Sequence, residues 1–104
     1  MTNKNIAIDY DDTISLNIEA WQLIINLFAS LGANVYIVTY RASTQFDDMN
    51  MSLENVRDYI FTNAMAKRRY CEEIAGLKMD IWIDDFPESV VHDYKDLLKS
   101  MKVQ

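Results

Sequence analysis

Three aspartates directly follow an apolar run near the N-terminus, since Asp9, Asp11 and Asp12 come after the residues 6–8. Strands favour β-branched and aromatic residues and are depleted in Asp, and crowded carboxylates repel one another unless a cation or a proton relieves the repulsion. Asp9 and Asp11 are two residues apart, so a continuing strand would place both side chains on one face. One carboxylate could then attack as a nucleophile while the other transfers protons. A divalent metal is the simplest source of the missing positive charge.

Two later apolar runs also end at polar residues. The second run ends at Thr39, a late run ends at Asp84 and Asp85, and Lys67 lies between them. In a parallel sheet covered by helices, ligands bind at the carboxyl ends of the strands. We therefore expect Asp9, Thr39 and Asp84 to lie at one edge of a sheet.

This ordered set resembles the haloacid dehalogenase-like superfamily of phosphatases and phosphotransferases. That family has D-x-D-x-T after one strand, Ser or Thr after another, a Lys on a helix and a carboxylate pair after a later strand; here the motifs span residues 6–85. The resemblance implies that Asp9 is the nucleophile and forms an aspartyl-phosphate. It implies that Asp11 is the general acid toward the leaving group and then the general base toward water. It also implies that Thr39 donates a hydrogen bond to a phosphoryl oxygen.

The same resemblance implies Mg²⁺ as the cofactor, held by Asp9, Asp11, Asp84 and Asp85. Hard oxygen ligands with open positions for water suit this ion. We expect direct ligation by Asp9, by Asp84 and by the backbone carbonyl of Asp11. Asp85 would act directly or through a water molecule.

Two further residues are expected to help bind the substrate. Thr13 closes the first motif, and its hydroxyl can hydrogen-bond the turn, steady Asp11, or instead cap the following helix. Arg41 ends a T-Y-R segment that is similar to the S/T-x-R of the 3′-phosphatase domains of polynucleotide kinases, where the guanidinium helps to hold phosphate. Arg suits bidentate phosphate contact, although an Arg on the surface after a strand is also common.

The alternation of apolar runs and helical patterns predicts one α/β domain over residues 1–104: a doubly wound three-layer sandwich with a central parallel sheet, Rossmann-like and without a cap domain. The expected strands lie near residues 5–9, 34–39, 57–62 and 80–84. The expected helices lie near residues 17–31, 65–75 and 87–101, with a short helical or irregular crossover within 43–55. This superfamily inserts caps at two positions, which correspond to residues 14–17 and 63–66 here. Both segments are too short to hold a cap.

Helical phase predicts the direction of the lysine. A projection of residues 65–75 at about 100° per residue places Lys67 on the same broad side as Cys71. Arg68 and Arg69 point outward, and each has a glutamate four residues on, which favours surface ion pairs. Lys67 is thus expected to reach the strand ends and to neutralise the nucleophile and the transferring phosphoryl group.

The first predicted helix is more apolar than one buried face requires. Its polar residues form one narrow stripe at helical spacing: Glu19, Gln22, Asn26 and Ser30. One interpretation is a helix packed deeply between the sheet and its neighbours. The other is a homodimer contact through an exposed flank with Trp21 or Leu23.

Charge and composition limit the partners. The net charge of −6 argues against broad electrostatic capture of nucleic acid, although Arg41 and residues 67–69 could form a local positive rim. The most apolar stretch, residues 20–31, is too short and too polar for a membrane span, and we expect no membrane partner and no signal peptide. Cys71 is the only cysteine, which is compatible with a reducing cytoplasm.

These observations predict a Mg²⁺-dependent phosphomonoester hydrolase. The substrate stays open among nucleotides, phosphorylated nucleic-acid ends, sugar phosphates and phosphoproteins; a capless site suits a large substrate or a lid from a neighbouring subunit. One alternative is a phosphoacceptor signalling domain of the receiver type, but that fold expects its phosphorylated Asp after the third strand, where this chain has Thr62. The other alternative is a non-catalytic binding module with the same fold.

Overall fold

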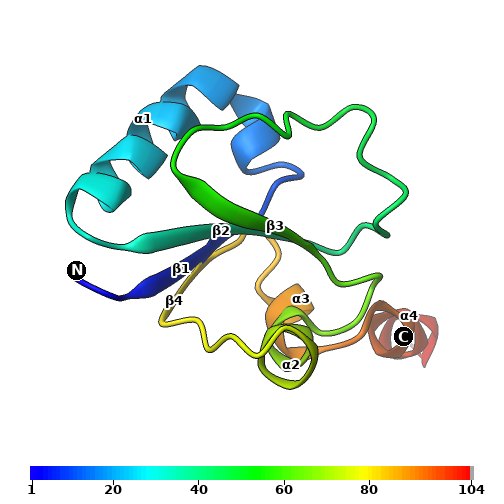
Figure 1. The fold of residues 1–104 in the computed structure, drawn as a ribbon. Coiled ribbons are helices and arrows are strands. Elements are labelled where there is room, and N and C mark those ends of the chain that lie inside the picture. Colours follow the sequence, from blue (N-terminus) through cyan, green and yellow to red (C-terminus); the bar gives the residue numbers. More distant parts are fainter. Residues whose placement is uncertain (104) are drawn as a thin grey trace.

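A four-stranded, all-parallel sheet forms the centre of the protein, as seen in a computed structural model that describes residues 1–103 and the side chains of residues 1–100. The strands are β1 (Asn5–Ile8), β2 (Asn34–Thr39), β3 (Val56–Phe61) and β4 (Ile81–Ile83). Their spatial order is β3-β2-β1-β4, so β1 is central and pairs with β2 and β4 (Figure 1). All four strand carboxyl ends therefore point to one edge of the sheet, as expected for an α/β fold.

Helices lie on both sides of this sheet. They are α1 (Ile18–Ser30), α2 (Lys67–Arg69), α3 (Glu88–Val91) and α4 (Tyr94–Val103). A 3-10 turn at Ile14–Leu16 precedes α1, and a π-helical turn at Tyr70–Ile74 continues α2. Figure 1 shows α1 on one side of the sheet and α2 with α3 on the other. None of the described helices combines the length and the apolar character that a membrane crossing requires.

The two central strands, β1 and β2, are buried on both faces, which explains their nearly continuous apolar runs, whereas β3 and β4 at the sheet edges are partly exposed. Ile6 and Ile8 of β1 pack toward Ile25 of α1, whereas Ala7 packs on the opposite face with Cys71. Side chains of successive strand residues point to opposite faces, so two separate core clusters form. The predicted strands are confirmed, and each of their ends agrees to within one residue.

The expected single helix over residues 87–101 is wrong, because the chain leaves the helical conformation at His92 (φ −128°, ψ 144°) and starts again as α4. Contacts with the segment before α2 explain the break. The Asp93 carboxylate accepts a hydrogen bond from the Ala66 backbone N–H at 2.7 Å, and the Tyr94 N–H donates to the Ala64 carbonyl at 2.8 Å. These long-range bonds replace the local ones of a continuous helix.

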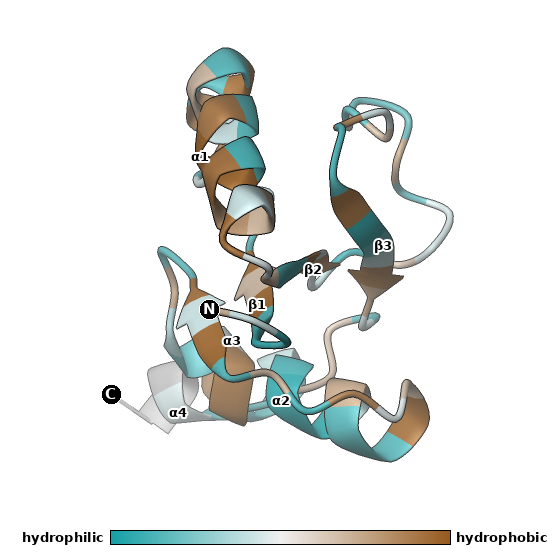
Figure 2. Ribbon diagram, turned by 60° about the vertical axis from the view of Figure 1, so that its left-hand side comes forward, coloured by the Kyte–Doolittle hydropathy of each residue, from teal (hydrophilic) through white to brown (hydrophobic). Residues whose placement is uncertain are grey.

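The polar stripe of α1 contacts the irregular crossover between β2 and β3. The Gln22 side-chain carbonyl accepts from the Glu54 N–H at 2.8 Å, and the Asn26 side-chain carbonyl accepts from the Asn55 side-chain amide at 2.9 Å. The apolar flank is left open, since Leu23 and Leu27 are 71% and 61% exposed. The interpretation of this helix as packed deeply between the sheet and its neighbours is therefore wrong. Brown bands along α1 in Figure 2 show its apolar character.

Candidate active site at the strand ends

A cleft of about 370 Å³ opens at the carboxyl ends of β1, β2 and β4. Its walls include most of the residues that the sequence predicts for the site, namely Asp9, Asp11, Thr39, Lys67, Asp84 and Asp85. Four residues that the sequence analysis did not assign also line it: Asp12, Tyr40, Phe86 and Ser89. Thr13 and Arg41 lie behind the cleft wall and contact its aspartates. The structure thus gathers residues that are up to 80 positions apart, from Asp9 to Ser89.

The Lys67 ammonium group lies between two carboxylates. It donates hydrogen bonds to Asp9 Oδ1 at 2.8 Å and to Asp84 Oδ2 at 2.6 Å. Lys67 is only 2% exposed, so its inward direction agrees with the helical phase of the sequence. A buried charge requires close opposite charges to offset its lost hydration. Two ion pairs provide that compensation, and they join α2 to β1 and β4.

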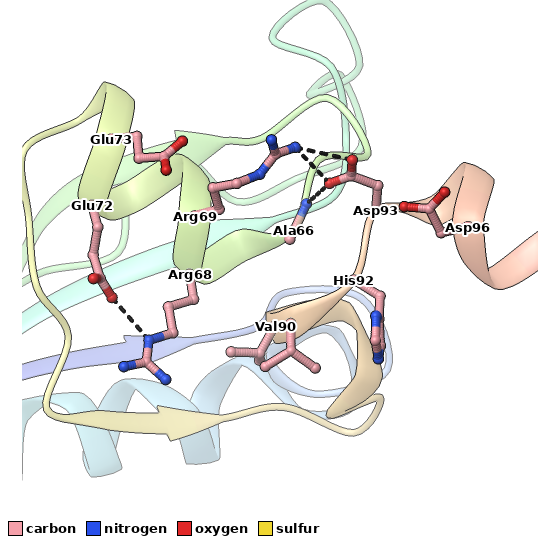
Figure 3. A pocket seen from close by; sticks show the side chains of 10 residues that line it. Ala66, Arg68, Arg69, Glu72, Glu73, Val90, His92, Asp93 and Asp96 are labelled. Atoms are coloured by element: carbon pink, nitrogen blue, oxygen red, sulfur yellow. Dashed lines mark hydrogen bonds and ion pairs between the residues drawn. The ribbon is translucent and has the colours of Figure 1, made fainter.

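The position of α2 depends on Asp93. The Asp93 carboxylate accepts from the Ala66 N–H and also from the Arg69 guanidinium, at 2.9 Å to Oδ2 (Figure 3). These contacts, first the Ala66 N–H and then Arg69, hold the pKa of Asp93 below its usual range. The expected outward pair of Arg68 with Glu72 is present at 2.9 Å. Arg69 instead pairs with Asp93, so its expected surface pair with the following glutamate is wrong.

A second hollow, of about 490 Å³, lies on the outer side of α2 and α3 (Figure 3). It is larger than the strand-end cleft but contains none of the site residues that the sequence predicts. Its arginines are paired with carboxylates of the same wall, since Arg68 contacts Glu72 and Arg69 contacts Asp93. We therefore locate the candidate chemistry in the strand-end cleft.

Asp9 is buried and held by several partners. Its backbone N–H donates to the Ile83 carbonyl at 2.9 Å, which extends the β1–β4 pairing to the start of the cleft. The Thr13 hydroxyl lies 3.2 Å from Asp9 Oδ2 and 3.4 Å from Asp85 Oδ1. Burial raises the pKa of Asp9 to about 7, and the Lys67 charge acts against this rise. Each oxygen of the Asp9 carboxylate thus has a hydrogen-bond partner, and the group is largely shielded from water.

Thr13 therefore steadies Asp9 and Asp85, whereas the sequence suggested a contact with the turn, with Asp11 or with the next helix. Its side chain makes no capping hydrogen bond to the 3-10 turn that follows. Ser89 is a related position that the sequence analysis missed. This buried residue donates from its hydroxyl to Asp84 Oδ2 at 3.1 Å. The only available signal was its place in the first turn after Pro87, which also fits an ordinary helix start.

Three carboxylates are close enough to share a cation. Oxygen atoms of Asp9, Asp84 and Asp85 all lie within 4.8 Å of one another. Asp84 is oriented by the Phe86 N–H, which donates to its Oδ1 at 3.0 Å. Carboxylate oxygens of this kind fit Mg²⁺ better than they fit soft metals. Among the described residues, the Asp11 carboxylate does not belong to this group of three.

Thr39 and Tyr40 form the β2 side of the cleft. Thr39 is buried, and its Oγ1 accepts from the Arg41 N–H at 3.2 Å, so the hydroxyl hydrogen can point to a ligand oxygen. The Tyr40 hydroxyl donates to the His92 carbonyl, and its ring centroid lies 5.6 Å from the Lys67 ammonium. Burial, with the charge of Asp93 next, raises the pKa of Tyr40 to about 12. Nothing in its sequence context distinguished Tyr40 from an ordinary aromatic residue after a strand.

Arg41 contacts Asp11 instead of projecting into the cleft. Its Nε and Nη2 donate to the two Asp11 oxygens at 2.9 and 2.6 Å, and Asp48 is a second carboxylate partner. The Asp11 side chain remains 48% exposed on the cleft side. The carboxylates that the sequence predicts for nucleophile and for proton transfer thus have different cationic partners, Lys67 and Arg41.

The cleft combines a buried ammonium group, a carboxylate triad, a second, partly exposed carboxylate and a threonine hydroxyl. Such a set can bind a divalent cation, neutralise an anionic ligand and offer a carboxylate for attack. Comparison with protein-family models, with curated proteins and with solved structures gave no match.

Proposed function

We propose that this protein is a Mg²⁺-dependent phosphomonoester hydrolase of the haloacid dehalogenase-like superfamily, with Asp9 as the nucleophile. One observation carries the proposal: the buried Lys67 ammonium, in the wall of the strand-end cleft, bridges Asp9 and Asp84 at 2.8 and 2.6 Å. A cation at this place favours the ionised nucleophile and attracts the phosphoryl group. A lysine with a purely structural role would not need to line a cleft.

The reaction consists of two displacements at phosphorus. In the first, an Asp9 carboxylate oxygen forms a bond to phosphorus, the bond to the leaving oxygen breaks, and Asp11 gives that oxygen a proton. In the second, Asp11 removes a proton from water, the water oxygen bonds to phosphorus, and the bond to Asp9 breaks. Inorganic phosphate leaves and the Asp9 carboxylate is restored. The Thr39 hydroxyl donates to a phosphoryl oxygen during both steps.

Asp9, Asp84 and Asp85, together with the backbone carbonyl of Asp11, would hold the Mg²⁺ ion. The bound ion supplies positive charge that screens the phosphate from the nearby carboxylates. Lys67 offsets part of the charge of Asp9 and Asp84, and Ser89 and the Phe86 N–H keep Asp84 oriented.

The proposal includes a doubly wound three-layer sandwich without a cap. Supporting this, α1 lies on one side of the sheet and α2 with α3 on the other. The first of the two cap positions holds a 3-10 turn, and the second a tight turn in which Asn63 and Ala64 have φ of 53° and 64°. The open cleft suits phosphate groups at the ends of nucleic acids or on proteins, besides nucleotides and sugar phosphates. We place the activity in the cytoplasm, where the free, buried thiol of Cys71 stays reduced.

The test is phosphate release by the purified protein with Mg²⁺ and with EDTA, across nucleotides, sugar phosphates, phosphopeptides and 3′- or 5′-phosphorylated oligonucleotides. Asp9→Asn is expected to abolish release, and Asp47→Asn, which removes an exposed carboxylate, is the control. Transfer of labelled phosphate to the protein, lost in Asp9→Asn and sensitive to hydroxylamine, would identify the acyl-phosphate. Mg²⁺ binding without release from any substrate would instead favour a binding module, and Asp9 labelling without turnover a phosphoacceptor domain.

A further inference from the structure

The guanidinium group of Arg41 has no free hydrogen-bond donor. Arginine carries five N–H donors. Nε and one Nη2 donor contact the Asp11 oxygens at 2.9 and 2.6 Å, and the other Nη2 donor contacts Asp48 Oδ2 at 3.3 Å. Nη1 donates to the Gln45 carbonyl at 2.8 Å and to Asp48 Oδ1. A phosphate could bind to Arg41 only if one of these contacts broke.

These contacts attach Asp11 to the crossover between β2 and β3. Arg41 follows β2, whereas Gln45 and Asp48 belong to the crossover. The Arg41 guanidinium also lies 5.9 Å from the ring centroid of Tyr10, whose hydroxyl accepts from the Asn50 N–H at 2.8 Å. The crossover therefore supports two neighbouring residues within the first aspartate motif, Tyr10 and Asp11.

We propose that Arg41 is a positioning residue that orients the Asp11 carboxylate, and that Asp48 holds Arg41 in the required direction. This inference rests on the proposed function, in which Asp11 transfers the protons. A bidentate guanidinium fixes the plane of a carboxylate. Each carboxylate oxygen has two lone-pair directions, so the fork leaves one direction on each oxygen for water or for the leaving group. Arg41 thus acts on the reaction through Asp11 and does not hold the substrate.

The kinetic test uses the Arg41→Gln substitution in the wild-type protein and in an Asp11→Asn background, with p-nitrophenyl phosphate and Mg²⁺. This activated ester keeps the turnover of the Asp11 variant measurable. Arg41→Gln is expected to lower the kcat of the otherwise wild-type protein about 10- to 100-fold, because a misdirected Asp11 would lose part of the rate gain that general acid–base catalysis provides. KM should change less than about threefold. In the Asp11→Asn background the same substitution should change kcat by less than about twofold, because residues that act as one unit are not additive.

Three further variants separate orientation from charge. Arg41→Lys keeps the positive charge but loses the fork, so it should lower kcat almost as much as Arg41→Gln. Asp48→Asn is expected to lower kcat about two- to fivefold, since an exposed ion pair contributes modestly. Asp47→Asn removes the same charge one residue away and should match the wild type. In NMR spectra, the Arg41 Nε–H signal should shift in Asp11→Asn and stay unchanged in Asp47→Asn.

Several outcomes would overturn the inference while leaving the proposed function intact. One is a raised KM with unchanged kcat in Arg41→Gln. Another is an equal loss of kcat on Arg41→Gln in the wild-type and in the Asp11→Asn background. A third is an Arg41 Nε–H signal that does not shift in Asp11→Asn. Full rescue by Arg41→Lys would also overturn it. A wild-type protein that releases no phosphate from any ester would overturn the proposed function and this inference together.

Discussion

Lys67 is the residue whose loss should disturb the fold and the site together. Lys67→Met would leave the buried carboxylates of Asp9 and Asp84 without their shared cation. Removing one partner of a buried ion pair typically costs about 3–5 kcal/mol, and we expect a loss of this order in the free energy of unfolding together with loss of phosphate release. Urea denaturation in metal-free buffer measures the first effect. Lys78→Met, at an exposed position near the opposite edge of the sheet, is the control; equal stability of the two variants would contradict the expectation.

Asp9 should make the metal-free protein less stable as the pH rises. The pKa of its carboxyl is raised from 3.8 to about 7 in the folded protein. Between these values the folded state keeps a proton that the unfolded state releases, so the free energy of unfolding falls with increasing pH. Asp9→Asn removes this contribution. In urea denaturation we therefore compare the free energy of unfolding of Asp9→Asn with that of the wild type. We expect this difference to favour the variant more at pH 8 than at pH 5. A difference that is the same at both pH values would refute this.

At the scale of secondary-structure elements, the turn from α1 into β2 requires glycine. Gly32 has φ of +86°, and a Cβ atom there would lie 3.1 Å from the Thr2 Cα. Gly76 has φ of +69° but open space around it. Both Gly→Ala changes should cost about 1–2 kcal/mol for the left-handed backbone, and Gly32→Ala should cost more because a backbone atom blocks its Cβ. Thermal unfolding of both variants provides the comparison, and a lower Tm for Gly76→Ala would contradict it.

Elements with a strong local pattern could be predicted from the sequence, and elements decided by distant contacts could not. The central strands β1 and β2 were predictable because burial on both faces produces long apolar runs. The inward direction of Lys67 followed from helical periodicity. The break between α3 and α4 depends on Asp93 bonding to Ala66, and the Arg69 partner depends on the same contact. No spacing rule within one helix contains that information.

The site shows the same division between local and distant information. The strand-end positions of Asp9, Thr39 and Asp84 were expected, because the ends of parallel strands meet at one edge. The closure of the cleft by Tyr40 could not be expected, since its partner His92 lies 52 residues away and is brought close by folding. Ser89 was missed for a different reason: its partner Asp84 is only five residues away, but a serine at this position also fits an ordinary helix start.

At the scale of the whole molecule, the exposed flank of α1 is the place where a second copy would bind. Leu23 and Leu27 of α1 are 71% and 61% exposed, and Leu16 in the preceding 3-10 turn is 73% exposed. If the expected homodimer forms through α1, light scattering at high concentration should give twice 12.1 kDa, and Leu27→Glu should give 12.1 kDa. Ile74→Glu, at another exposed apolar position, should leave the dimer intact. A wild-type mass of 12.1 kDa at all concentrations would exclude this contact.

The bridge from Lys67 to Asp9 and Asp84 has a consequence for biosynthesis. The protein carries an internal counter-ion for its most buried acids, so these carboxylates do not need an external ion before the sheet can assemble. If the protein binds Mg²⁺ as proposed, the newly made chain can fold first and bind the ion later. If Mg²⁺ is the cofactor, as proposed, a cell that is short of magnesium would accumulate a folded and inactive reserve of this protein.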